Sequence, residues 1–98
     1  MRMDGGAMRV RLYGFLRETV KTAWVTVAVD TGDTVGTALQ RLVKQYPRLA
    51  DQVFERPGVL RLYMLIAVNG RDVRDALGLE TQVAPEDEMA VFPPSAGG

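Results

Sequence analysis

The stretch DTVGTALQRLVKQYP (residues 33–47) predicts the helix around which the fold is organised. Thr34 is a suitable N-cap, because its hydroxyl can accept a hydrogen bond from a free backbone N–H of the first turn. Pro47 ends the helix, since the residue before a proline disfavours helical backbone angles. Between these limits the apolar residues recur on one face, which must be buried against other elements: Val35, Leu39, Leu42, Val43 and Tyr46.

Two strands are predicted before this helix. Residues 8–15 (MRVRLYGF) alternate in polarity, with one side formed by Val10 and Leu12 and the other by Arg9, Arg11 and Tyr13. Residues 23–29 (AWVTVAV) are rich in β-branched side chains and alternate again. The polar link RETVKT between the two runs is short, which suggests an antiparallel hairpin.

Further strands are predicted after the helix, at residues 62–68 (LYMLIAV) and 88–92 (EMAVF). Asn69-Gly70 ends the first of them and suits a type I′ turn, so the following Arg-Asp-Val can pair back briefly. Additional helical turns are expected within residues 48–55 and near residues 75–77.

A helix inserted between two hairpin-like units must cover one face of a mixed sheet. The first and last strands can then lie side by side in the middle of that sheet. The prediction is an α+β protein with the β-grasp, or ubiquitin-like, fold, in which about four to five strands pack on one main helix. Residues 1–7 are assigned to a leader, 8–92 to the β-grasp domain and 93–98 to an extended tail.

Composition narrows the range of possible functions. The 98 residues include no cysteine and no histidine, so a thiol nucleophile, the commonest general base and the commonest metal ligand are all absent. Twelve basic and twelve acidic residues balance, and the scattered arginines form no basic stripe of the kind that nucleic acid requires. No apolar run is long enough to cross a membrane. We therefore expect a cytoplasmic protein that holds no metal, binds neither nucleic acid nor membrane, and is not an enzyme by itself.

One face of the predicted sheet is more apolar than a solvated face should be. If Met64, Ile66 and Val68 face the helix, the opposite face carries an apolar set formed by Tyr63, Leu65, Ala67, Ala90 and Phe92. Such a patch on a small protein marks a partner surface. We expect Phe92 to anchor that surface while contributing little to the fold. The alternative is that the segment 48–61 folds over part of the patch.

The sequence ends FPPSAGG (residues 92–98), which is either a frayed end or a chemical handle. Pro93 and Pro94 lack a backbone N–H, so they cannot extend the sheet and direct the chain outward in an extended form. The residues that follow have almost no side-chain bulk and could thread a narrow channel: Ser95, Ala96, Gly97 and Gly98. The terminal carboxylate is unreactive at neutral pH, and becomes an acyl donor only when a partner activates it, for instance as an acyl-adenylate.

These closing residues resemble the C-terminal signature of the molybdopterin synthase small subunit and its sulfur-carrier relatives. The resemblance extends over residues 8–98, through VRLYGFLRE, GDTVGTALQRLVKQYP, IAVNGRDV and GLETQVAPEDEMAVFPPSAGG. It implies that an activating enzyme uses ATP to adenylate Gly98, that Gly98 then becomes a thiocarboxylate, and that Gly97 precedes it in the partner's channel. No cofactor would bind to the chain directly.

The resemblance also implies a role, with alternatives. As the small subunit of molybdopterin synthase, the chain would donate sulfur to a pterin precursor inside a large catalytic subunit that holds the acid–base residues. The turn PEDE and Ser95 depart from the usual family pattern. The segment 52–61 makes the domain longer than in the shortest members and is similar to a subgroup that includes carriers serving cysteine synthesis or tRNA thiolation. A ubiquitin-like modifier that forms an amide through Gly98 is a further alternative, and a binding module without tail chemistry is another.

Overall fold

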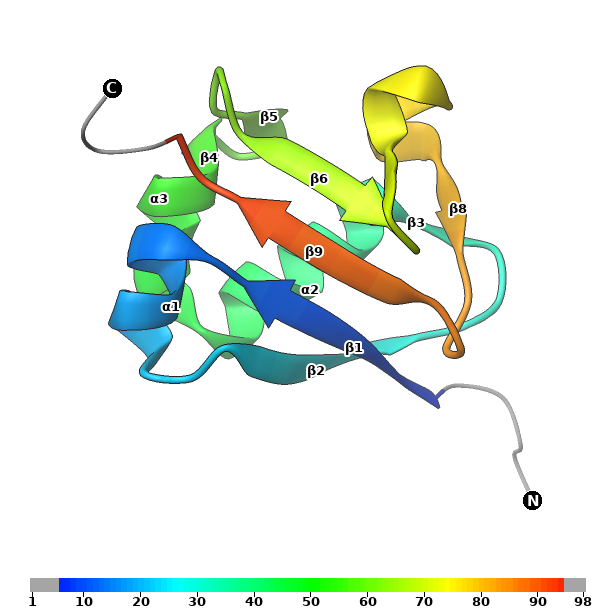
Figure 1. Cartoon of the computed structure of the whole chain (residues 1–98), viewed down its shortest axis with the longest axis horizontal. Coiled ribbons are helices and arrows are strands. Elements are labelled where there is room, and N and C mark those ends of the chain that lie inside the picture. The colour runs from blue at the N-terminus through cyan, green and yellow to red at the C-terminus, as the bar shows by residue number, and fades with distance from the viewer. Residues whose placement is uncertain (1–5, 95–98) are drawn as a thin grey trace.

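A five-stranded mixed sheet forms the centre of the computed structural model, which describes residues 6–94 (Figure 1). β1 pairs in parallel with β9, and the other neighbouring strands of this sheet pair in antiparallel fashion. The first and last strands are therefore side by side, which is the β-grasp arrangement that the sequence predicts. Across the sheet the order of strands is β2 (Trp24–Val29), β1 (Gly6–Leu12), β9 (Glu88–Phe92), β6 (Leu65–Val68) and β7 (Arg71–Asp72).

Helix α2 (Val35–Gln45) covers one face of this sheet. Thr34 is its N-cap, as predicted, and the Thr34 hydroxyl accepts a hydrogen bond of 3.1 Å from the backbone N–H of Thr37. Leu39 and Leu42 are fully buried, whereas Val43 and Tyr46 lie at the margin of the core. The strands contribute the opposing side of this core through Met8, Val10, Leu12, Ile66, Met89 and Val91.

The connection between β1 and β2 differs from the prediction. A short helix, α1 (Gly14–Val20), replaces the expected turn, and the strand predicted over residues 8–15 ends at Leu12. Gly14 has a φ of +56°, which turns the chain out of the strand, and Leu16 is fully buried and fixes the helix to the core. The antiparallel pairing of β1 with β2 survives this insertion.

The Asn69-Gly70 turn is confirmed, because both residues adopt positive φ angles of 52° and 83°, as a type I′ turn requires. The strand before it begins at Leu65 and not at residue 62, since Tyr63 has a φ of +70°, which is incompatible with a strand. At the other end of the domain β1 begins at Gly6, so Gly6 and Ala7 belong to the sheet and not to the leader assigned to residues 1–7.

Short elements complete the structure between and beside the main strands. The expected helical turns appear at 47–53 and at 73–75, the second slightly earlier than predicted. No helix among residues 6–94 has the length and apolar character to span a membrane. In chain order these elements are β3 (Asp33–Thr34), η1 (Pro47–Leu49), α3 (Ala50–Val53), β4 (Phe54–Arg56), β5 (Val59–Leu60), η2 (Val73–Asp75), η3 (Gly78–Glu80) and β8 (Gln82–Val83), with β3 paired to β8 and β4 to β5.

The burial of α2 leads to a stability prediction. Leu42→Ala should lower the free energy of unfolding by about 2–5 kcal/mol, because it removes a fully buried side chain and leaves a cavity. Val43→Ala removes the neighbouring side chain from the margin of the core and is the matched control, with a smaller expected loss. Denaturant titration of both variants measures the difference, and an equal loss would show that the face of α2 is assigned incorrectly.

Candidate functional site

The tail leaves the sheet at the end of β9. Phe92 is the last residue of the strand and lies opposite Leu65 of β6. On the other side, the backbone N–H of Tyr13 donates to the carbonyl of Val91 at 3.3 Å. Pro93 and Pro94 follow and have no N–H with which to continue either ladder, as predicted. The remaining predicted site residues lie outside the described part of the chain: Ser95, Ala96, Gly97 and Gly98.

Gly14 fixes the start of this exit. An added Cβ at Gly14 would lie 2.8 Å from the Cγ atom of Pro93, which is closer than real Cβ contacts allow. The φ of +56° at Gly14 also disfavours any residue with a side chain. Both facts require glycine at the junction of β1 and α1. Pro93, the first proline of the tail, therefore packs against the backbone at Gly14, where β1 connects to α1.

Four of the five residues predicted to form the outer apolar patch lie together on the sheet face that is turned away from α2. The register places Leu65 opposite Phe92 and Ala67 opposite Ala90. Ala67 is buried, and the other three are half-buried. Tyr63 is different, because it precedes β6 in a turn and is 78% exposed, so the strand alternation that linked it to the patch does not apply.

The outer face is not covered by the segment 48–61, which was the alternative to a partner surface. Figure 1 looks onto this face, and α2 lies behind the sheet. The buried side chains of that segment, Leu49, Val53 and Phe54, belong to the same core as Leu39 and Leu42 of α2. The segment therefore packs on the helix side of the sheet, and the outer face stays open among the described residues.

The structure extends the patch with an aromatic and arginine cluster that the sequence reasoning missed. The rings of Tyr13 and Phe92 stack with centroids 4.3 Å apart and an interplanar angle of 17°. The guanidinium carbon of Arg11 is 5.0 Å from the ring centroids of both Tyr13 and Trp24. Arg9 lies over Trp24 as well, at 4.7 Å, and forms an ion pair of 2.6 Å with Glu88. The sequence alternation had placed Arg9, Arg11 and Tyr13 on this face, but only the strand register joins them to Trp24 and Phe92.

The stacking on Tyr13 also corrects one expectation about Phe92. An aromatic pair in this geometry is worth about 0.5–1.5 kcal/mol beyond the area that it buries. Phe92 thus stabilises the free domain as well as belonging to the outer face, and a variant at this position will not leave the fold untouched.

The perturbed carboxyl groups of the described chain have structural explanations. The backbone N–H of Asp30 and then the guanidinium of Arg41, 2.7 Å away, lower the pKa of Asp33, which closes the turn after β2. The side chain of Arg74 lowers the pKa of Asp72, which caps η2 and raises the pKa of Arg74 in return. Both carboxylates accept hydrogen bonds that hold turns. Within residues 6–94 no group of three or more His, Cys, Asp or Glu side chains is arranged to hold a metal ion.

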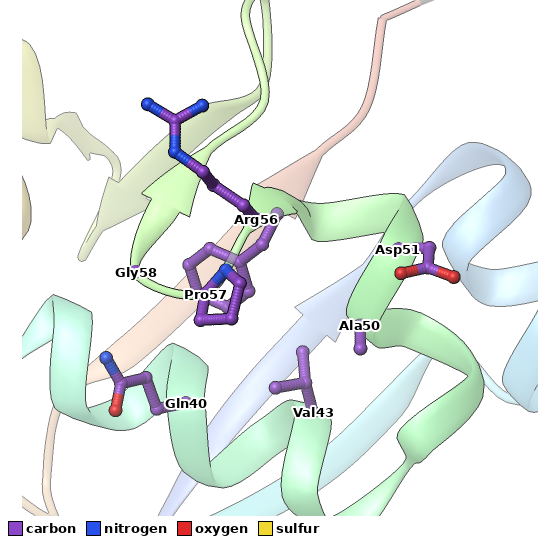
Figure 2. A pocket seen from close by; sticks show the side chains of 8 residues that line it. Gln40, Val43, Ala50, Asp51, Arg56, Pro57 and Gly58 are labelled. Carbon is purple, nitrogen blue, oxygen red and sulfur yellow. The ribbon is translucent and has the colours of Figure 1, made fainter.

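A surface hollow of about 460 Å³ lies on the helix side of the sheet, between α2, α3 and the β4–β5 hairpin (Figure 2). Val43 and Ala50 contribute to its apolar part, and the guanidinium of Arg56 is directed away from them. The hollow lies on the side of the sheet opposite the aromatic and arginine cluster. It brings together no nucleophile and base, so it offers no catalytic arrangement of its own. Its lining is completed by Gln40, Asp51, Phe54, Pro57 and Gly58.

Comparisons with known proteins identify relatives over almost the whole chain. Residues 10–98 match the ThiS family. Small archaeal modifier protein 1 of Haloferax volcanii is 37% identical over 91 residues, which is 93% of this chain and 100% of that protein. The crystal structure of that protein superposes with a TM-score of 0.84 at 36% identity, covering 95% of this chain and 100% of the other.

Two more distant structures share the fold. CysO of Mycobacterium tuberculosis is 27% identical with a TM-score of 0.74, covering 90% of this chain and 99% of that one. A Pyrococcus furiosus protein described as a candidate molybdopterin converting factor, subunit 1, is 20% identical with a TM-score of 0.69, covering 92% of this chain and 99% of the other. The second similarity shows the fold alone.

The contact of Gly14 with Pro93 can be tested by substitution. Gly14→Ala should lower the free energy of unfolding by about 1–3 kcal/mol, because it combines an unfavourable positive φ with a steric clash. Gly58→Ala is the matched control, since Gly58 also has a positive φ, +81°, but has nothing within 4 Å of the added Cβ. Thermal melting of both variants isolates the effect of the clash, and a loss no larger at Gly14 than at Gly58 would contradict the contact.

Proposed function

The chain belongs to the ThiS family, and from this premise we propose that it is a ubiquitin-like carrier whose Gly98 carboxylate is activated by a partner enzyme. The observation that supports this proposal best is the position of the tail exit. Pro93 leaves the domain directly beside Phe92, at the end of the open outer face. A partner that covers this face therefore meets the start of the tail, and the narrow residues after Pro94 can enter its active site.

The proposed activation follows ordinary acyl chemistry. A Gly98 carboxylate oxygen attacks the α-phosphorus of ATP in the partner's site, and pyrophosphate leaves. The resulting acyl-adenylate has a good leaving group, which the free carboxylate lacks. Hydrosulfide then attacks the acyl carbon, AMP leaves, and loss of the remaining S–H proton gives a thiocarboxylate on Gly98. The chain supplies the acyl group and the docking surface, while the partner supplies ATP and the acid–base groups, so the chain is not catalytic alone. A cytoplasmic location is part of the proposal.

A second fate of the activated Gly98 is favoured by the relatives. The Haloferax volcanii protein, 37% identical over the whole of its length, is named as a modifier. In that role the amine of a target lysine attacks the carbonyl of the acyl-adenylate, loses a proton and displaces AMP, which leaves an amide between the lysine and Gly98. Conjugation to proteins is therefore the second candidate function.

The role as a small subunit of molybdopterin synthase has weaker support. It rests on the sequence resemblance over residues 8–98, whereas the Haloferax volcanii modifier protein and CysO, both above 25% identity, carry other names. Transfer of sulfur to an acceptor other than a pterin, as in cysteine formation or tRNA thiolation, agrees better with these relatives. The acceptor is chosen by the partner that holds the tail.

Intact mass of the chain from its own host separates the two fates. Exchange of one oxygen for sulfur at Gly98 adds about 16 Da, whereas conjugation produces larger branched adducts that carry the chain on a lysine. Gly98→Ala is the control for both products. A chain that carries neither modification, and that no activating enzyme adenylates, would contradict the proposal.

The tail length should be critical for activation. Deleting Gly98, or adding one residue after it, should abolish adenylation by the cognate activating enzyme and leave the melting temperature unchanged, because the carboxylate must reach a fixed position. ATP–pyrophosphate exchange measures activation. One residue added at the N-terminus is the control and should be activated normally. Normal activation of the C-terminally extended chain, with no proteolytic removal of the added residue, would refute this requirement.

Phe92→Ala should weaken binding to the activating enzyme by about thirtyfold, as truncation of an aromatic anchor near the centre of an interface does. The loss of stacking on Tyr13 should also lower the stability of the free domain by about 1 kcal/mol. Calorimetric titration and a melting curve measure the two effects separately. Leu77→Ala is the control, because it removes an exposed apolar side chain between η2 and η3. It should change neither the affinity for the activating enzyme nor the melting temperature. A variant at Phe92 that melts earlier but binds normally would remove it from the interface.

A further inference from the structure

Arg11 has hydrogen-bonding capacity that the described chain leaves unused. Its neighbours across the strands are Trp24 of β2 and Ala90 of β9, and neither can accept a hydrogen bond through its side chain. The Nε atom is buried and has no hydrogen-bond partner within residues 6–94, and no ion pair involving Arg11 occurs there. Arg9, two residues earlier on the same face, is by contrast paired with Glu88 at 2.6 Å.

The guanidinium of Arg11 is nevertheless held in place. It contacts the rings of Tyr13 and Trp24 at equal distances of 5.0 Å, and cation–π attraction favours this position. An arginine that is already ordered loses less side-chain entropy when it binds than a free one. Because Nε is the nitrogen that is buried, the terminal nitrogens are the ones that can reach a ligand, and their fork geometry matches a carboxylate.

Arg11 also lies within the surface that a tail-binding partner would cover. Tyr13, which contacts Arg11, stacks on Phe92, and Phe92 immediately precedes Pro93. A partner seated on Phe92 must therefore remove water from Arg11 as well. Burying a guanidinium without a counter-charge is costly, so a partner adapted to this surface has to place an acceptor opposite it.

The distribution of charged residues over the domain indicates that this acceptor on the partner is negatively charged. The acidic stretch from Asp75 to Glu88 lies at the end of the sheet opposite Phe92 (Figure 1). At the end of the sheet near the tail exit, α1 with its C-cap, η1, α3 and β4 carry four basic residues against three acidic ones: Arg17, Lys21, Arg48 and Arg56 against Glu18, Asp51 and Glu55. The end of the domain that presents the tail is therefore basic, which favours an acidic partner surface.

We propose that Arg11 is a specificity-determining residue that binds an aspartate or glutamate carboxylate on the surface of the activating enzyme, with Tyr13 and Trp24 holding its guanidinium in position. The inference rests on the proposed function and adds the chemistry by which the partner is recognised. The carboxylate accepts hydrogen bonds from the terminal nitrogens of Arg11, while the apolar residues beside it, Leu65 and Phe92, contribute burial.

The test is ATP–pyrophosphate exchange by the activating enzyme from the same genome, with the chain as the varied substrate. Arg11→Glu should raise the KM for the chain about thirtyfold with little change in kcat, because Gly98 and its chemistry are untouched. Arg11→Lys keeps the charge but loses the planar fork and should give an intermediate KM. The wild-type advantage over Arg11→Glu should shrink as NaCl is added. Arg56→Glu makes the same charge change on the helix side, where its side chain is 68% exposed, and should match the wild type.

The outcomes separate the inference from the proposed function. No exchange with the wild-type chain overturns the proposed function and the inference with it. Normal exchange with a folded Arg11→Glu variant overturns the inference alone, as does an equal loss in Arg11→Glu and Arg56→Glu. If Arg11→Glu unfolds, the Arg11→Lys variant tests the inference instead. A wild-type KM in Arg11→Lys would exclude a contact between both terminal nitrogens of the guanidinium and a carboxylate, and would overturn the inference. A wild-type dimer that Arg11→Glu converts to a monomer with unchanged exchange would assign the face to a second copy of the chain and overturn the inference.

Discussion

The parallel pairing of β1 with β9 is the contact on which the rest of the structure depends. It joins the first and last strands of the chain in parallel, so the chain between them has to cross from one end of the sheet to the other, and α2 lies on one face within this connection. Helix α2 provides most of that packing through its buried leucines. The same pairing places Leu12 beside Val91, so the β1–α1 junction and the start of the tail become neighbours. The tail exit and the outer face are therefore consequences of one strand contact.

The sequence could predict those elements whose characteristic residues lie within one short segment. The N-cap at Thr34 and the apolar period of α2 lie within a single segment, as does the Asn69-Gly70 turn. Helix α1 was missed because it is only 7 residues long, has no side-chain cap, and begins inside an alternating run. Helices of this length are not stable by propensity alone, and α1 depends on burying Leu16 in a core that only the folded chain provides.

The candidate site shows the same limit. The alternation within each strand identified Leu65, Ala67, Ala90 and Phe92 as one surface, and the register agrees. The cluster around Arg11 combines side chains from in or beside β1, β2 and β9. Its members become neighbours only through the registers of β1 with β2 and of β1 with β9, which the sequence of a single strand does not determine. The positive φ of Tyr63 has no signal in the sequence, so the position of that residue could not be foreseen.

The central position of β9 has a mechanical consequence. A conjugate attached to the tail, or an enzyme that holds it, can pull on the domain through Phe92. β9 is held by a ladder on each side, to β1 and to β6, so it cannot be peeled away as an edge strand can. Because β1 and β9 run in parallel, tension between the two ends of the domain shears their hydrogen bonds and loads them together. Force applied at the C-terminal end of the described domain is therefore met by a strand that is paired on both sides.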